Sequence, residues 1–485
     1  MVVSIRLACR LYKRGIVLML LAFVSGCATY QQTANVQLAR FNQGHSDSAI
    51  AYFTTRQHGI NKQLYLAEAG RLKMLEGDFA GSHGLFERVI DVIFDVREGA
   101  MIRLQDVGGG ALAATFLDDR SRPYNLPAFE SVLVFQYQSL NALFMGNPEA
   151  AAVEARRAVA AQDLVLERYE REVERARELA VQEGSDGVVD TLDDYFVRIG
   201  PVLGRAKSGF QNPFVWYYSG LMYELQGEPD NAYIAYKKAW ELSPDNAWVQ
   251  RDLLRLAERQ NPQEWGAFKE QFDLGARVRL RGATGEIIIF YEEGLISQRH
   301  SVVFPVLLGS TFHNISYPVY QDGPYQPMQI RATLRPGSEI GDLMPLAYLQ
   351  SLAYHDLKMR LPAIQVRNIS RAVSREVARS IGRNSDDALL DFILSLWAMV
   401  SFVSERADTR GWYSLPMGVQ MLRSYVAAGD HTLVLQRDGG GDKLEIPLQL
   451  LPGEQKLVWV ADLGLRRSWA VASLTHAGLA ATHVD

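Results

Sequence analysis

The spacing of apolar residues divides the chain into three kinds of segment. A short apolar run at residues 16–24 follows a basic stretch near the N-terminus. From about residue 44 to 272 apolar residues recur at intervals of three and four, which is typical of amphipathic helices. From about residue 273 to 465, short apolar or alternating runs bounded by glycine and proline predict β-strands. The pattern predicts a multidomain α+β protein with an all-α N-terminal half and a β-rich, sandwich-like C-terminal half.

A helical insertion at about 367–404 is expected to interrupt the β-rich half. Its first part, 367–382, is amphipathic, and its second part, 388–403, is almost wholly apolar. The second part would extend only about 24 Å as a helix, too short to span a hydrocarbon core of about 30 Å comfortably. A buried helix or one resting on a membrane is expected instead, and the buried helix is preferred. Residues 466–485 are expected to form a C-terminal tail. The expected strands are 277–281, 285–291, 301–308, 328–333, 431–436, 444–450 and 456–461, with a hairpin turn at 438–442.

The N-terminus predicts export. A run of about nine apolar residues rises only about 14 Å as a helix, too short to span a bilayer, so residues 1–26 are predicted to be a cleaved signal peptide. Residues 24–27, Val-Ser-Gly-Cys, resemble the lipobox of bacterial lipoproteins. That resemblance implies cleavage before Cys27 and acylation of Cys27 with fatty acids such as palmitate. A plain secretory signal with an incidental cysteine is the alternative.

The residues after Cys27 bear on the destination. Ala28 and Thr29 follow the cysteine, and in lipoproteins of Gram-negative bacteria the absence of Asp there implies the outer membrane. Residues 27–43 are expected to be a lipidated polar tether. The other cysteine, Cys9, lies in the signal peptide, so the mature chain could form no structural disulfide.

The segment from Pro213 to Asn246 resembles a tetratricopeptide repeat, a pair of helices of about 34 residues. In such a repeat the helices cross closely where Gly220 and Ala232 meet, and Gly227 allows the turn. Two weaker copies align on Gly77 and Gly146. Because one repeat cannot bury its own apolar face, we expect a solenoid over 44–272. The residues that carry the resemblance are Trp216, Gly220, Tyr223, Gly227, Ala232, Tyr236, Ala239 and Pro244, with Gly70, Ser82, Phe86 and Val89 in the first weaker copy and Ser139, Ala151, Ala155 and Ala158 in the second.

The inner face of such an array is the expected partner-binding surface. Aromatic side chains with polar tips suit peptide capture because they bury area at low entropic cost. The alternative is that this groove is already covered, either by a long charged helix at about 162–183 or by the C-terminal domain. That long stretch is itself expected to pack along the array, a partner-binding coiled-coil arm being the alternative. The expected groove residues are Phe214, Tyr217, Tyr218, Leu221 and Glu224.

No local motif predicts catalysis, a cofactor or a metal site. The nine histidines have no paired metal-ligand spacing, and no nucleophile motif is present. Adjacent Glu292 and Glu293 are expected in a solvated turn rather than in glycan hydrolysis. Asp438 and Asp442 supply too few oxygens for calcium, and Gly108-Gly-Gly110 lacks the rest of a phosphate loop. A net charge of −5 gives no whole-chain field for nucleic acid.

The overall layout resembles a family of uncharacterised bacterial outer-membrane lipoproteins that join tetratricopeptide-like repeats to a C-terminal β domain. The resemblance rests on residues 70–79, 291–294, 361–368 and 408–412. It implies an architecture and a location on the periplasmic face of the outer membrane, and no catalytic residues.

Three functions are therefore considered. The preferred one is a non-enzymatic, lipid-anchored scaffold that holds a protein or peptide partner in cell-envelope assembly. The second is a regulator of peptidoglycan synthesis or remodelling. The third is an enzyme with a dispersed site in the β domain, which would show a deep polar pocket with several titratable groups.

Overall fold

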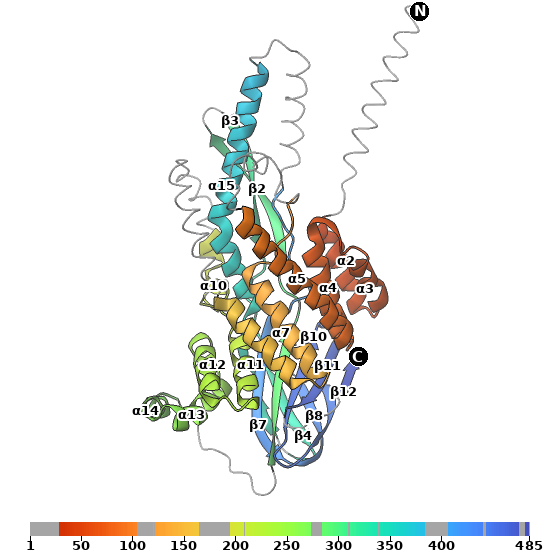
Figure 1. Ribbon diagram of the computed structural model, residues 1–485, viewed down its shortest axis with the longest axis vertical. Coiled ribbons are helices and arrows are strands. Elements are labelled where there is room, and N and C mark those ends of the chain that lie inside the picture. Colours follow the sequence, from red (N-terminus) through yellow and green to blue (C-terminus); the bar gives the residue numbers. More distant parts are fainter. Residues whose placement is uncertain are drawn as a thin grey trace, which may run out of the picture.

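The structure is a computed structural model of a mixed α+β protein, with helices in the N-terminal half followed mainly by strands (Figure 1). It describes residues 29–103, 120, 122–163, 195–207, 209–272, 284–308, 311–337, 339–383, 406–439, 443–474 and 481–484. Several predicted features lie outside these residues: the signal peptide, Cys27, the 108–110 loop, the charged stretch beyond residue 163, the strand at 277–281 and the apolar segment 388–403.

The helical part consists mainly of consecutive helices joined by short turns. Three of these turns contain Gly77, Gly146 and Gly227 at φ of 79°, 77° and 72°, a left-handed conformation that other residues adopt only at a cost. The helices are α2 (Tyr30–Asn42), α3 (Ser46–Thr54), the short η1 (Gly59–Asn61), α4 (Lys62–Leu75), α5 (Phe79–Arg103), α7 (Ala128–Phe144), an unlabelled helix at 148–163, α10 (Gly200–Leu203), α11 (Pro213–Leu225), α12 (Pro229–Leu242), α13 (Ala247–Gln260), α14 (Pro262–Gln271) and α15 (Leu349–Arg383).

Equivalent helix pairs cross at equivalent residues. A Cβ on Gly220 would lie 2.5 Å from the ring of Tyr236, and a Cβ on Gly70 would lie 2.9 Å from the ring of Phe86. In a further pair, formed by α7 and the helix at 148–163, Ser139 stands at the position of the glycine and Ala155 stands at the position of the ring. A bulky ring on the second helix therefore goes together with a missing side chain on the first.

The expected tether is corrected by α2. Residues 30–42 form a helix capped by Thr29, whose side chain accepts from the backbone N–H of Gln32. Ala34, Leu38 and Phe41 are buried in the main core. Their spacing of four and three residues is that of an apolar stripe, which the many polar residues between them obscure at the level of composition.

The strands form three sheets. The largest has six strands in the order β12-β11-β10-β1-β7-β6, in which β1 and β10 are parallel and the other neighbours antiparallel. A four-stranded antiparallel sheet has the order β5-β4-β8-β9, and β2 pairs with β3. The strands are β1 (Thr284–Glu293), β2 (Arg299–Leu308), β3 (Thr311–Tyr320), β4 (Ile330–Arg335), β5 (Glu339–Asp342), β6 (Met344–Ala347), β7 (Gly418–Ala427), β8 (Gly429–Arg437), β9 (Lys443–Leu450), β10 (Gln455–Asp462), β11 (Arg467–Ser473) and β12 (Ala481–Val484).

The six-stranded sheet is the middle of three layers. Ile288 and Phe290 of β1 point into a core shared with the helices, whereas Ile287 and Ile289 point into a second core shared with the four-stranded sheet. Because β1 is buried on both faces, its apolar residues are consecutive rather than alternating. The helical half and the β-rich half are thus joined by one continuous apolar core.

Most expected strands are present, and others were not anticipated. Outside the undescribed 277–281, each predicted strand overlaps an observed one, while β3, β5, β6, β7, β11 and β12 were not predicted. The expected tail is corrected, because 467–473 pairs with β10 and 481–484 pairs with β11. Within β11, Trp469 and Val471 face one core and Ala470 and Ala472 the other. The predicted helix 367–382 lies within the much longer α15.

Candidate functional site

Four of the five predicted groove residues lie in the interior of the protein, and the fifth, Glu224, is partly exposed. Phe214, Tyr217 and Tyr218 have no exposed surface, and Leu221 is 3% exposed. Their partner is the chain's own sheet: the ring centroid of Phe290 lies 5.0 Å from that of Phe214, 6.0 Å from Tyr217 and 6.3 Å from Tyr218. The side of α11 that faces inward therefore packs on β1.

Glu224, the fifth predicted residue, belongs to a charged joint between the helices and the sheet. It pairs with Arg423 of β7 at 3.1 Å and with Arg255 of α13 at 2.7 Å. Burial alone would raise the pKa of Glu224, but the two guanidinium groups lower that pKa to about 2. Arg423 also binds Glu286 of β1 at 2.8 Å, so one buried cation links α11, β1 and β7.

A second buried ion pair joins α4 to the end of β1. Arg71 donates to Glu292, and the two side chains are 0% and 1% exposed. The guanidinium of Arg71 also lies 4.4 Å from the ring centroid of Tyr137. Glu293, on the opposite face of β1, accepts a hydrogen bond from Tyr325 at 2.6 Å. The expectation of a solvated turn at these glutamates is wrong, because both lie within a fully buried strand and each has its own partner.

A second segment of the chain, residues 406–417, also occupies the inner side of the helices. Glu68 of α4 accepts from the backbone N–H groups of Tyr413 at 2.7 Å and Ser414 at 3.1 Å. Glu130 of α7 accepts from the backbone N–H of Trp412 at 3.2 Å. The Trp412 ring is 1% exposed. Two carboxyl groups thus hold three successive amides of the segment that leads into β7.

Glu68 and Glu130 have unusual acidities for carboxyl groups. Burial raises the pKa of each to about 7, although their hydrogen bonds lower it. Tyr30 donates to Glu68 at 3.2 Å and Tyr124 donates to Glu130 at 3.0 Å. Both glutamates are completely enclosed, so they act on the chain's own backbone and have no opening to an external substrate.

The predicted partner-binding groove is therefore corrected: it is filled by β1, β7 and residues 406–417 of the same chain. The structure agrees with the alternative, in which the C-terminal part of the chain covers the groove. Its physical reason is that the rings of α11 and the apolar residues of β1 bury each other within one molecule. The sequence signal for this cover is the unbroken apolar run in β1, because a strand with apolar residues on both faces needs apolar cover on both sides.

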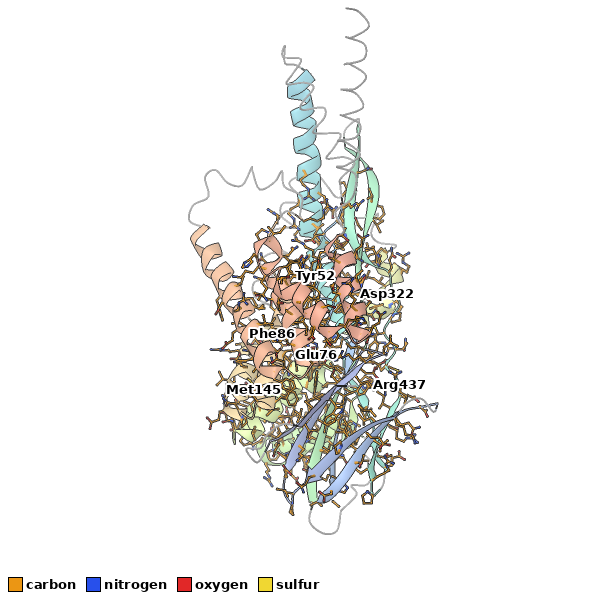
Figure 2. The ribbon with its side chains drawn as sticks, turned by 90° about the vertical axis from the view of Figure 1, so that its right-hand side faces the viewer. Tyr52, Glu76, Phe86, Met145, Asp322 and Arg437 are labelled. Atoms are coloured by element: carbon orange, nitrogen blue, oxygen red, sulfur yellow. The ribbon has the colours of Figure 1, made fainter. Side chains whose placement is uncertain are left out.

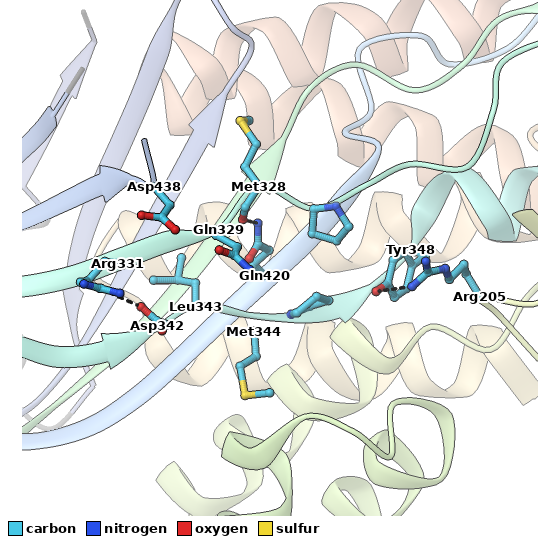
Figure 3. Close-up of a pocket in the computed structure, with 12 residues that line it drawn as sticks. Arg205, Met328, Gln329, Arg331, Asp342, Leu343, Met344, Tyr348, Gln420 and Asp438 are labelled. Carbon is cyan, nitrogen blue, oxygen red and sulfur yellow. Dashed lines mark hydrogen bonds and ion pairs between the residues drawn. The ribbon is translucent and has the colours of Figure 1, made fainter. Parts of the chain in front are cut away.

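One open pocket of about 440 Å³ lies between the two larger sheets, at their β5 and β6 edges (Figure 3). Leu343, Met344 and Gln420 line it, and charged side chains stand around it. Arg331 and Asp342, which form an ion pair at 3.3 Å, are 53% and 62% exposed. Arg205 lies over the ring of Tyr348, 5.4 Å from its centroid, at the far end from Asp438. The arrangement is a surface hollow with a largely apolar lining, and the charged groups around it remain in contact with water.

Among the residues that the structure describes, no group of three or more His, Cys, Asp or Glu side chains is placed to hold a metal ion. None of their helices is long and apolar enough to cross a membrane. No protein-family model matches the chain. No curated protein matches it either.

Proposed function

We propose that the protein is an outer-membrane lipoprotein on the periplasmic side, where it acts as a non-enzymatic scaffold that binds a protein partner in cell-envelope assembly. The proposal combines the lipobox-like residues 24–27 with the architecture of the folded part. We also propose that the helix pairs are tetratricopeptide-like repeats, on the strength of their shared glycine turns and crossing residues.

The start of α2 supports close attachment to the membrane. Tyr30 begins the helix only three residues after Cys27. A fully extended chain spans about 3.5 Å per residue, so a lipid on Cys27 would lie within about 10 Å of the folded body. Such a protein would stand directly on its membrane rather than on a long tether.

The outer helices supply the surface that carries the scaffold proposal. Val153 is 46% exposed and Ile234 is 55% exposed. The two are equivalent: each follows by two residues the repeat alanine of its helix, Ala151 in 148–163 and Ala232 in α12. Since the inner groove is filled, these aligned apolar positions are the candidate contact for a partner protein.

Crosslinking and affinity capture from cell envelopes test this assignment. A Val153→Asp and Ile234→Asp double variant should lose a specific partner that the parent chain captures, because a buried carboxylate is costly in an apolar contact. Val197→Asp is the matched control, since Val197 is 78% exposed on a different surface. Equal capture by all three proteins would refute the outer-helix surface, and an unmodified Cys27 in mass spectra would refute the lipid anchor.

A further inference from the structure

The β2–β3 hairpin and the second half of α15 project together from one end of the molecule, and we name them the arm. Both views show them extending beyond the packed layers (Figures 1 and 2). The ring of Tyr354 stacks on that of Tyr320 at 4.3 Å, and Asn368 donates to the backbone oxygen of Ser316 at 2.9 Å. Helix and hairpin therefore run side by side, and ten residues of strand give the hairpin a length of about 33 Å.

The hairpin has an apolar sequence whose two faces differ in cover: Val302 and Phe304, on one face of β2, pack against the main core, whereas Val303 lies on the opposite face. Residues 302–308 read Val-Val-Phe-Pro-Val-Leu-Leu, so apolar residues occupy both faces of β2. Such a run is typical of a strand covered on both sides, and Val303 is nevertheless 44% exposed. Among the described strands β2 pairs only with β3, and α15 supplies the helix packing that a two-stranded ribbon needs on one of its faces.

The helix of the arm is strongly basic. Arginines occupy every fourth position from Arg367 to Arg383; Arg371 is buried and donates to Asn368, and Arg375, Arg379 and Arg383 continue the row toward the end of the helix. Over the same stretch, Glu376 is the one acidic residue. This charge contrasts with the net charge of −5 of the whole chain. The arm therefore combines an apolar hairpin with a cationic helix.

The base of the arm lies beside the first helix after Cys27. Gln31 of α2 donates to the side chain of Gln298 at 3.3 Å, and Asn35 donates to the same oxygen at 2.5 Å. Gln298 immediately precedes β2. The lipid attachment point and the base of the arm are thus brought to the same part of the molecule.

We propose that the arm docks on an anionic phospholipid surface, that of the membrane holding the Cys27 lipid; this rests on the anchoring part of the proposed function. Val303 and the open face of the hairpin enter the boundary between headgroups and acyl chains, and Arg375 and Arg379 of α15 lie at the phosphates. The free edges of a two-stranded ribbon cannot be satisfied in the hydrocarbon core, which limits the hairpin to this interfacial depth. A lipid surface matches both chemistries of the arm at once.

A single-thiol label tests the contact in the full lipidated protein. With Cys9 removed in the signal peptide and Cys27 acylated, Val303→Cys provides the one thiol for an environment-sensitive fluorophore. In vesicles of phosphatidylethanolamine and phosphatidylglycerol, we expect a blue-shifted emission and strong quenching by lipids brominated on their acyl chains. The same label in an Ile234→Cys variant, exposed on α12, should show neither effect.

Charge reversal separates the two chemistries. Adding Arg375→Glu and Arg379→Glu should reduce quenching of the label at position 303 several-fold. Arg259→Glu with Lys269→Glu, the same change in charge on exposed positions of α13 and α14, should leave quenching unchanged.

Three results would decide against the arm's contact with lipid. The proposal is overturned if the label at position 303 is as exposed to water as the label at position 234. It is also overturned if Arg375→Glu with Arg379→Glu leaves the quenching unchanged. Crosslinking between two copies through position 303 in detergent without phospholipid also overturns it, because a second copy would then cover the hairpin. If Cys27 is not acylated, only the proposed lipid anchor fails. Flotation of the unlipidated chain with the same vesicles then still tests whether the arm binds lipid.

Discussion

Lowering the pH should raise the free energy of unfolding, because it neutralises two carboxyl groups that are costly to bury in their ionised form. Glu68 and Glu130 have folded-state pKa values of about 7, against an ordinary value of 4.5. Between these two values the folded protein binds more protons than the unfolded chain. The free energy of unfolding therefore falls as the pH rises through this window, which is the reverse of the behaviour of a salt-bridged carboxylate.

The size of the effect follows from the linkage relation. Each pH unit over which the folded carboxyl group stays protonated while the unfolded one is ionised is worth about 1.4 kcal/mol. Between about pH 5.5 and pH 8 that interval is about 1.5 units for each group, so each glutamate should contribute a loss of about 2 kcal/mol. With both groups titrating independently, the loss approaches about 4 kcal/mol.

Urea unfolding followed by circular dichroism at the two pH values measures this directly. Glu68→Gln and Glu130→Gln should each remove about half of the difference, because an amide does not titrate. Glu224→Gln is the control: burial opposes, but Arg423 and Arg255 hold the pKa of Glu224 at about 2, outside the window. That variant should be less stable than the wild type at both pH values, and the difference in its free energy of unfolding between the two pH values should be unchanged. A wild-type protein equally stable at both, or a difference that survives both glutamine substitutions, would refute the reasoning.

Three further substitutions test how the layers are joined, with the free energy of unfolding as the measurement. Asn246→Asp keeps an N-cap for α13 but loses the side-chain amide that donates to two backbone oxygens of β6. We expect a loss of about 1–3 kcal/mol in the free energy of unfolding. Unchanged stability would show that these two hydrogen bonds do not join α13 to β6. Gly220→Ala should cost about 1–3 kcal/mol, whereas Gly84→Ala, with open space around it, should be neutral or stabilising; equal effects would contradict the close crossing. Arg71→Met should cost about 3–5 kcal/mol, and adding Glu292→Leu should recover part of it; additive losses would show that the two residues are not coupled.

Local sequence signals were sufficient for the individual elements that depend on neighbouring residues. The glycine turn at Gly227 and the close crossing at Gly220 follow from residues within one helix pair, and the structure shows both. Strands β8, β9 and β10 were predicted for the same reason, since alternation and turn residues act within a few positions. The long α15 was predicted only in part: the amphipathic segment 367–382 was expected, whereas the part before it, which contains Pro362, was not. A proline inside a helix is disfavoured locally, and packing of the whole chain tolerates it here.

The candidate site shows where local signals end. Phe214 and Tyr217 were predicted to line an inner face, and they do face inward, but the partner on that face is Phe290 of the same chain. An apolar side chain loses contact with water equally well against a foreign peptide or a strand of its own protein. Nothing in the sequence of α11 and α12 distinguishes these two cases.

The sequence by itself determined the helix pairs, half of the described strands and the lipobox-like segment, because those depend on the order of nearby residues. Only the tertiary structure decided that α2 is part of the core, that the groove is filled and that Glu68 and Glu130 hold residues 412–414. Each of these contacts joins residues hundreds of positions apart or more than one layer of the fold. The hydrophobic effect has no direction, so a sequence indicates which faces must be covered, and the packing of the whole chain selects what covers them.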